Sequence, residues 1–170
     1  MNSIPITMAD ALRTEFAREA ATTRRLLERM PGDRMDWKPH EKSFSTGRLA
    51  SHIVECLGWA DGIFTADELV MDPATYRPCL ASSVDDLLQT FDRRVGHYQS
   101  LLAAASEDSM MQPWRLVLMG KVRFEKPRFE VFRDLTLNHL IHHRGQLTVY
   151  LRLLDVPLPW VYGPTADERM

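Results

Sequence analysis

Two histidines one helical turn apart, His139 and His143, form the pattern with the clearest chemical meaning in this sequence. Residues four apart on an α-helix share one face and lie about 6 Å apart along the axis, so both imidazoles can reach one ion. His52, on an apolar stripe far upstream, is the candidate for a third ligand. The spacing therefore predicts a divalent metal ion held by His52, His139 and His143.

Three imidazoles would leave one coordination position open, which is typical of a catalytic site, and neutral imidazole suits zinc, copper, iron and nickel. The uncompensated charge of the ion would favour a bound hydroxide or thiolate. The alternative is a set of core histidines, each with a hydrogen-bond partner. Burying two such rings in contact without a ligand is costly, yet the residues alone leave both interpretations open.

Two familiar metal motifs are excluded by single positions. A zincin needs glutamate directly after the first histidine, where Leu140 stands. A di-iron carboxylate site needs glutamate three residues before a ligand histidine, and none of the three candidates has one. His142 competes with His143 as the partner of His139. His143 is preferred because it continues the apolar stripe.

Several neighbours of these histidines invite two interpretations. Glu55, three residues after His52, is either a hydrogen-bond acceptor for that ring or a solvated helix charge. Both cysteines are expected to be reduced, with Cys56 a small packing residue beside His52. Arg144 and Gln146 could bind a substrate carboxylate or could simply be exposed.

The composition fits one domain spanning residues 1–170. Lysine and arginine total 21 against 23 acidic residues, a net charge of −2 with no basic block, so nucleic-acid binding is not expected. No apolar stretch reaches the length of a membrane span, and the N-terminus shows no signal-peptide pattern. We therefore expect a cytoplasmic protein that has a small-molecule substrate and no membrane partner.

Four helices are predicted to position the histidines. Thr7, Ser45 and Ser83 are good N-caps, and apolar residues recur at helical spacing in residues 7–30, 45–63, 83–105 and 127–154. Residues 106–128 instead alternate with a period of two, which predicts a short irregular or hairpin insertion before the last helix. The predicted fold class is all-α, a four-helix bundle, in which metal sites are commonly built from inward-facing side chains.

The last predicted helix is apolar on more than one side, and Gly145 in its middle would allow another backbone to approach closely. This pattern predicts a homodimer. The alternative is that the segment around Trp114 covers the same surface within one chain.

Two stretches resemble the DinB family of DinB/YfiT-like metalloenzymes. From His139 to Glu168 the chain reads HLIHHRGQLTVYLRLLDVPLPWVYGPTADE, which is similar to the C-terminal signature of the family. From Trp37 to His52 it reads WKPHEKSFSTGRLASH, which is similar to the pattern that leads into the first histidine of the family. In helix order, the resemblance covers nearly the whole chain.

The resemblance implies an up-down-down-up four-helix bundle, often dimeric, with a divalent ion, usually zinc or nickel, on His52, His139 and His143. Related enzymes include maleylpyruvate isomerases and S-transferases that use low-molecular-weight thiols. The expected function is activation of such a thiol, or of water, for transfer to a small electrophile. Thiol is favoured because a thiolate is softer than hydroxide and better matched to zinc. The alternative is a noncatalytic metal-binding or stress-associated dimer whose ion is structural.

Overall fold

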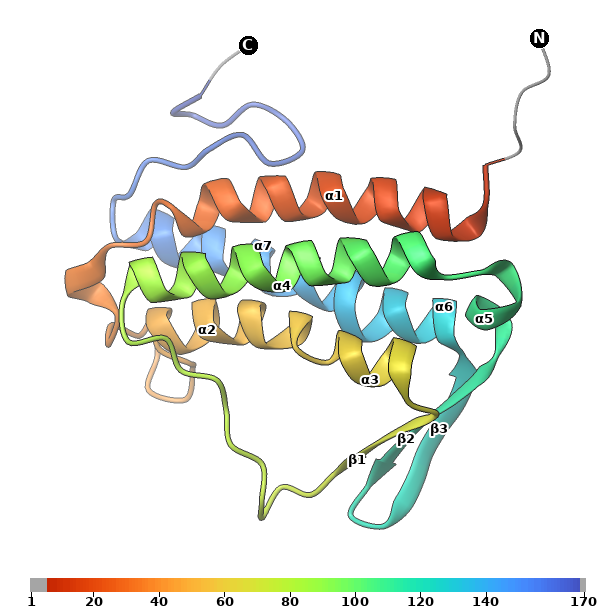
Figure 1. Ribbon diagram of the computed structural model, residues 1–170. Helices are drawn as coiled ribbons and strands as arrows, with labels where there is room; N and C mark the ends of the chain where they lie inside the picture. The colour runs from red at the N-terminus through yellow and green to blue at the C-terminus, as the bar shows by residue number, and fades with distance from the viewer. Residues whose placement is uncertain (1–5, 169–170) are drawn as a thin grey trace, which may run out of the picture.

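The computed structural model describes residues 6–168 of the chain, and most of these are helical (Figure 1). The long helices are α1 (Met8–Leu27), α2 (Thr46–Leu57), α4 (Val84–Ala104) and α7 (Asn138–Leu153). Helices α1 and α2 each contact both α4 and α7. This packing sets the helix that carries His52 directly against the helix that carries His139 and His143.

The predicted helix starts are confirmed at all three caps. The side chains of Thr7, Ser45 and Ser83 each accept a hydrogen bond from the backbone N–H three residues later. These bonds satisfy donors that have no partner inside the helix. The apolar stripes then meet in a common core, whose fully buried aromatic residues are Phe16, Phe91, Tyr98, Trp114 and Phe132.

A small three-stranded sheet shows that the all-α prediction was wrong. Strands β2 (Pro113–Leu118) and β3 (Lys121–Pro127) form the antiparallel hairpin expected in this region. Met119 and Gly120 both have positive φ in its two-residue turn, as a type I′ turn requires. The unpredicted strand is β1 (Glu68–Met71), which pairs in parallel with β2. A four-residue strand whose partner lies far along the chain has no local pattern by which to recognise it.

The second predicted helix is broken in two. Helix α2 ends at Leu57, and α3 (Ala60–Thr65) begins after Gly58 and Trp59. The Arg94 guanidinium donates to the Val54 carbonyl over 2.7 Å, and a Cβ at position 58 would lie 3.0 Å from Arg94 Cζ. Glycine therefore leaves room for this arginine at the end of α2.

The sheet is held to α3 by two buried side chains. Trp114 donates from its indole nitrogen to the Gly62 carbonyl over 2.8 Å. Arg128 donates to the carbonyls of Ile63 and Ala66 and pairs with Asp67. The hairpin and the residues around β1 are therefore fixed to the helices at the end of the molecule that holds α3 (Figure 1).

The last helical region begins after Pro127, as predicted, but is not uniform. A short helix α6 (Arg128–Val131) passes into a π-helical stretch, η2 (Phe132–Leu137), and then into α7. The wider π turns occur often at functional sites, and here they directly precede α7, whose second residue is His139. The remaining short elements are η1 (Gly32–Arg34) and α5 (Glu107–Met111). Among residues 6–168, no helix combines the length and apolarity that a bilayer span requires.

Arg144 is neither exposed nor available to a substrate. It is 1% exposed and lies 2.7 Å from the Glu19 carboxylate, which is itself buried on α1. The Tyr162 hydroxyl donates to Glu19 over 2.8 Å, and the Arg144 guanidinium lies 5.0 Å from the centroid of the Tyr162 ring. This network joins α7, α1 and the segment that follows α7. Arg144 is therefore part of the structural core.

Candidate metal centre

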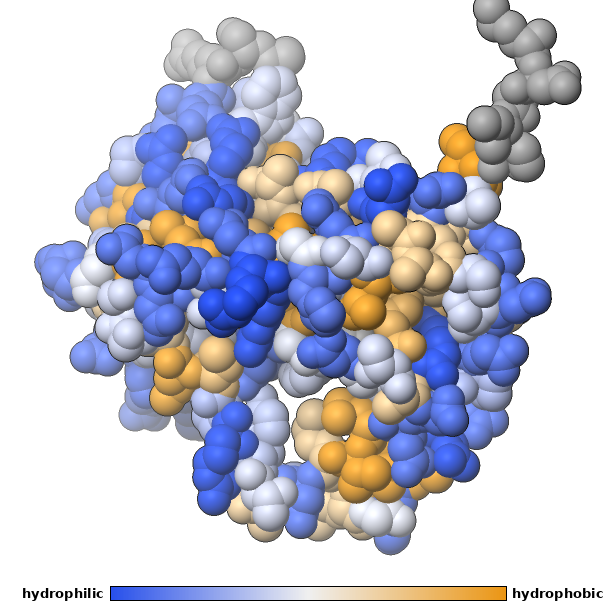
Figure 2. Space-filling view, in the orientation of Figure 1, coloured by the Kyte–Doolittle hydropathy of each residue, from blue (hydrophilic) through white to orange (hydrophobic). Residues whose placement is uncertain are grey.

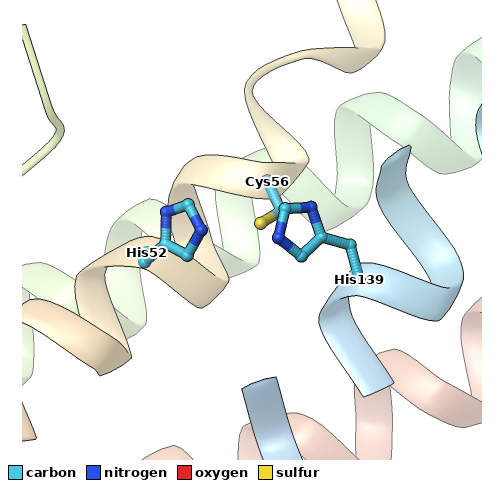
Figure 3. A group of neighbouring side chains, drawn as sticks. All are labelled: His52, Cys56 and His139. Carbon is cyan, nitrogen blue, oxygen red and sulfur yellow. The ribbon is translucent and has the colours of Figure 1, made fainter. Parts of the chain in front are cut away.

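The three predicted ligands meet between α2 and α7. The ring centroid of His52 lies 5.2 Å from that of His139 and 4.6 Å from that of His143, and the two rings of α7 lie 4.7 Å apart. Figure 3 shows His52 and Cys56 projecting from α2 toward His139 on the facing helix. The i to i+4 spacing on α7 and the contact between the helices thus gather three imidazoles in one place.

Each imidazole has a partner on its outer side. His52 Nδ1 lies 2.6 Å from Glu55 Oε2, and His143 Nδ1 lies 2.7 Å from Gln146 Oε1. The ring of His139 is hydrogen-bonded to the backbone of Leu135, one turn earlier. An acceptor of this kind fixes the tautomer and leaves the other ring nitrogen free to bind an ion. Gln146 therefore orients the His143 ring of the candidate site.

Glu55 is a buried part of this arrangement. Its side chain is 6% exposed, and it receives a hydrogen bond from Arg48 over 3.1 Å. The backbone N–H of Cys79 donates to its second oxygen over 2.8 Å. Burial opposes ionisation, but the Tyr76 hydroxyl, His52, Cys79 and Arg48 together hold the pKa of Glu55 below its usual range. The solvated interpretation was wrong: Glu55 is an ionised acceptor that orients His52.

The two histidines of α7 are neutral at pH 7. Burial, together with the neighbouring His139 and His52 rings, lowers the pKa of His143 to about 4, and the hydrogen bond with Gln146 opposes this shift. Burial and the His52 ring likewise lower the pKa of His139. Neutral imidazole is the form that binds a metal ion. The pocket therefore favours the protonation state that coordination needs.

Cys56 also lies among the potential ligands. Its interpretation as a small packing residue did not predict this position. Among the described residues, the ligand atoms that all lie within 4.8 Å of one another belong to His52, Cys56 and His139, and His143 is not part of this group (Figure 3). Cys56 is fully buried, and burial raises the pKa of its thiol to about 12. Its spacing of four residues from His52 was the signal available in the sequence. Without an ion it remains protonated.

His142 has a different environment from the three candidates. It is exposed, although its ring centroid lies 4.8 Å from that of His143. The rings of Phe44 and Trp59 instead flank His52, with centroids 5.9 and 6.0 Å away, and Trp59 also lies 5.5 Å from His139. These aromatic walls partly enclose the preferred cluster. His142 lies outside it.

The donor set fits a divalent ion. Three imidazole rings lie together while each has a hydrogen-bond partner on its outer side, and packing three polar rings together would otherwise be unfavourable. Imidazole is a suitable ligand for zinc or nickel. The neighbouring Cys56 thiol is a suitable ligand for a borderline-soft ion such as zinc. The carboxylate nearest to the rings, Glu55, is occupied with His52 and Arg48. The donors of the cluster are therefore nitrogen and sulfur.

Comparisons with known proteins agree with this architecture. The family model described as "DinB family" matches residues 7–169. The uncharacterized protein YrdA of Bacillus subtilis (strain 168) is 26% identical over 152 residues, which cover 88% of this chain and 85% of YrdA.

Two crystal structures share the fold. A DinB-like protein from Bacillus subtilis, YjoA, superposes with a TM-score of 0.67 at 20% identity, over 94% of this chain and 99% of that one. A DinB-like protein from Bacillus cereus ATCC 10987 gives a TM-score of 0.68 at 19% identity, over 94% of this chain and 100% of that one.

Proposed function

The chain belongs to the DinB family, and we propose that it is a divalent-metal-dependent enzyme whose ion is held by His52, His139 and His143. The observation that carries this proposal is the convergence of three imidazoles from two helices, with ring centroids 4.6 to 5.2 Å apart. The outer acceptors Glu55 and Gln146 support it, since they set two of the rings for coordination. Zinc or nickel is the proposed ion.

The proposed reaction is transfer of a low-molecular-weight thiol, or of water, to a small electrophile. A bound divalent ion supplies a Lewis acid that lowers the pKa of a coordinated thiol or water. The protein contributes three imidazoles, of which His139 and His143 are neutral at pH 7, and the rings of Phe44 and Trp59 flank His52. Thiol is preferred to water because sulfur is the better match for zinc.

The proposal extends to assembly and location. We propose that residues 1–170 form one DinB-like four-helix-bundle domain, that two copies associate through α7, and that the protein works in the cytoplasm. The exposed side chains of Val149 and Leu153 on α7 support the dimer, because each is more than half accessible. A Cβ at Gly145 would meet nothing within 4 Å, so the helix can be approached closely there.

A second candidate is a noncatalytic site in which the ion only joins α2 to α7. The position of Cys56 favours this candidate, because a fourth protein ligand would close the site, as in structural zinc centres. The two candidates differ in one property. A catalytic site binds a thiol from solution, whereas a closed site does not.

Cobalt substitution tests this difference. The chain is loaded with Co²⁺, and low-molecular-weight thiols such as cysteine or glutathione are added up to saturation. Direct binding should add a sulfur-to-cobalt charge-transfer band in the near ultraviolet and release a proton near neutral pH, because a free thiol has a pKa of about 8.5. An unchanged spectrum with every thiol would contradict thiol activation.

Cys56→Ala provides the control for the protein's own sulfur. Under the proposed function, cobalt-loaded protein shows no sulfur band before thiol is added, and the variant behaves identically. A band that is present from the start and disappears in Cys56→Ala would identify Cys56 as a ligand. The structural candidate would then be favoured.

A further inference from the structure

A small pocket lies beside the candidate metal centre, between β1 and the chain that follows it. Its volume is about 170 Å³, and its walls include Trp59, Leu69, Val70, Met71 and Tyr76. Figure 2 shows hydrophobic side chains gathered at the sheet end of this face, beside a hollow. The proposed function assigns no role to this pocket.

Two side chains connect the pocket to the histidines. Trp59 lines the pocket and also lies against His52 and His139, with ring centroids 6.0 and 5.5 Å apart. Tyr76 lines it too, and its hydroxyl faces the Glu55 carboxylate that orients His52. A molecule in the pocket therefore lies one side chain away from the metal ligands.

The size and charge of the pocket define what it can hold. A cavity of about 150 Å³ lined by apolar side chains accommodates one benzene molecule, so this pocket has room for one six-membered ring. Among its described lining residues, Asp72 alone carries a charge, and that charge is negative. A carboxylate or phosphate at this position would meet repulsion and no cation. The pocket suits an uncharged, apolar group.

We propose that this pocket binds the apolar end of the electrophilic substrate. The substrate class is an uncharged molecule with a single six-membered ring, or an alkyl group of similar size, whose electrophilic carbon extends past Trp59 toward the histidines. This inference rests on the proposed function, which supplies the assumption that the substrate is an electrophile. Binding of an apolar molecule in the pocket needs neither the ion nor a thiol. A dicarboxylate substrate would place one of its charges near Asp72 in this subsite, which disfavours its binding.

Binding of benzyl alcohol to the full-length chain as purified tests the proposal without any reaction. The titration is followed by proton NMR of the indole N–H signals of the four tryptophans, with Trp59 assigned from its loss in Trp59→Phe. The Trp59 signal should shift and saturate, while that of Trp114, which is hydrogen-bonded to Gly62, should not move. Benzoate should bind at least about five-fold more weakly because of Asp72.

Two matched valines supply the variants. Val70 and Val122 both pair with Val117 in the sheet and are 62% and 57% exposed, but Val70 lines the pocket. Val70→Asp should weaken benzyl alcohol binding about ten-fold, since it removes apolar surface and adds a second negative charge. Val122→Asp should leave binding unchanged.

The outcomes separate this inference from the proposed function. A saturable Trp59 shift that weakens only in Val70→Asp supports the pocket, whether or not thiols alter the cobalt spectrum. If the Trp59 signal does not shift, or if Val70→Asp and Val122→Asp weaken benzyl alcohol binding equally, the proposed binding role of the pocket is wrong. This holds even where the cobalt spectrum responds to thiols. Tighter binding of benzoate than of benzyl alcohol would overturn the uncharged substrate class.

Discussion

Replacing Glu19 with glutamine should strongly destabilise the protein, because it leaves the Arg144 guanidinium buried without its counter-charge. The two side chains are 4% and 1% exposed and lie 2.7 Å apart. Removing one partner of a buried ion pair costs about 3 to 5 kcal/mol. This is a large part of the roughly 5 to 15 kcal/mol that stabilises a typical domain. The remaining contacts of Arg144 with the Glu19 carbonyl and the Thr23 hydroxyl do not replace the charge.

An exposed ion pair of the same length gives the matched control. Arg24 and Asp92 also lie 2.7 Å apart, but their side chains are 39% and 46% exposed. Asp92→Asn should therefore cost only about 0 to 1 kcal/mol. The assay is urea denaturation of metal-free protein followed by circular dichroism, so that ion binding does not enter the comparison.

The double replacement Glu19→Leu with Arg144→Met tests the cause. Without either charge, the core need not desolvate an ion, so the double variant should recover most of the lost free energy of unfolding. Equal losses from Glu19→Gln and Asp92→Asn would refute the reasoning, because burial would then have made no difference to the pair.

Three further predictions concern the ion, its protonation and the assembly. His143→Ala should lose most of the divalent ion measured by elemental analysis while His142→Ala keeps it; the reverse would identify His142 as the ligand. The folded state holds the pKa of His143 near 4, below its unfolded value of about 6.5, so the unfolded chain binds more protons between these values. The free energy of unfolding of metal-free protein should therefore fall as pH drops from 6.5 to 4, and a pH-independent value would contradict the assigned burial. Light scattering should give twice the chain mass of 19.6 kDa, and a mass near 20 kDa at micromolar concentration would rule out the dimer.

The parts of the fold that local chemistry determines could be predicted from the sequence. The caps at Thr7, Ser45 and Ser83 each depend on a side chain and a backbone N–H three residues away. The hairpin before the last helix also has a local cause, in its period of two and the Met119-Gly120 turn. The same is true of His139 and His143, whose spacing alone predicts that their rings meet.

Features that depend on distant residues could not be predicted in this way. Strand β1 pairs with β2, which lies far along the chain, and α2 ends at Leu57, just before Gly58, where Arg94 of α4 packs. Arg144 looks like an exposed helix charge until Glu19, on another helix, is placed against it. Each of these outcomes depends on the tertiary structure, which a periodicity does not contain.

The role of Glu55 shows how such long-range contacts reach the candidate metal centre. One of its oxygens contacts His52, and the other accepts from the backbone of Cys79, in the segment between β1 and α4. The same segment begins at the wall of the apolar pocket, with Asp72 and Tyr76. Because one carboxylate joins the first histidine to this segment, the orientation of His52 and the shape of the pocket depend on each other. Glu55→Gln should therefore disturb both, weakening metal binding about 10- to 100-fold and reducing the Trp59 response to benzyl alcohol. If Glu55→Gln weakened metal binding but left the Trp59 response unchanged, or the reverse, the metal site and the pocket would be independent.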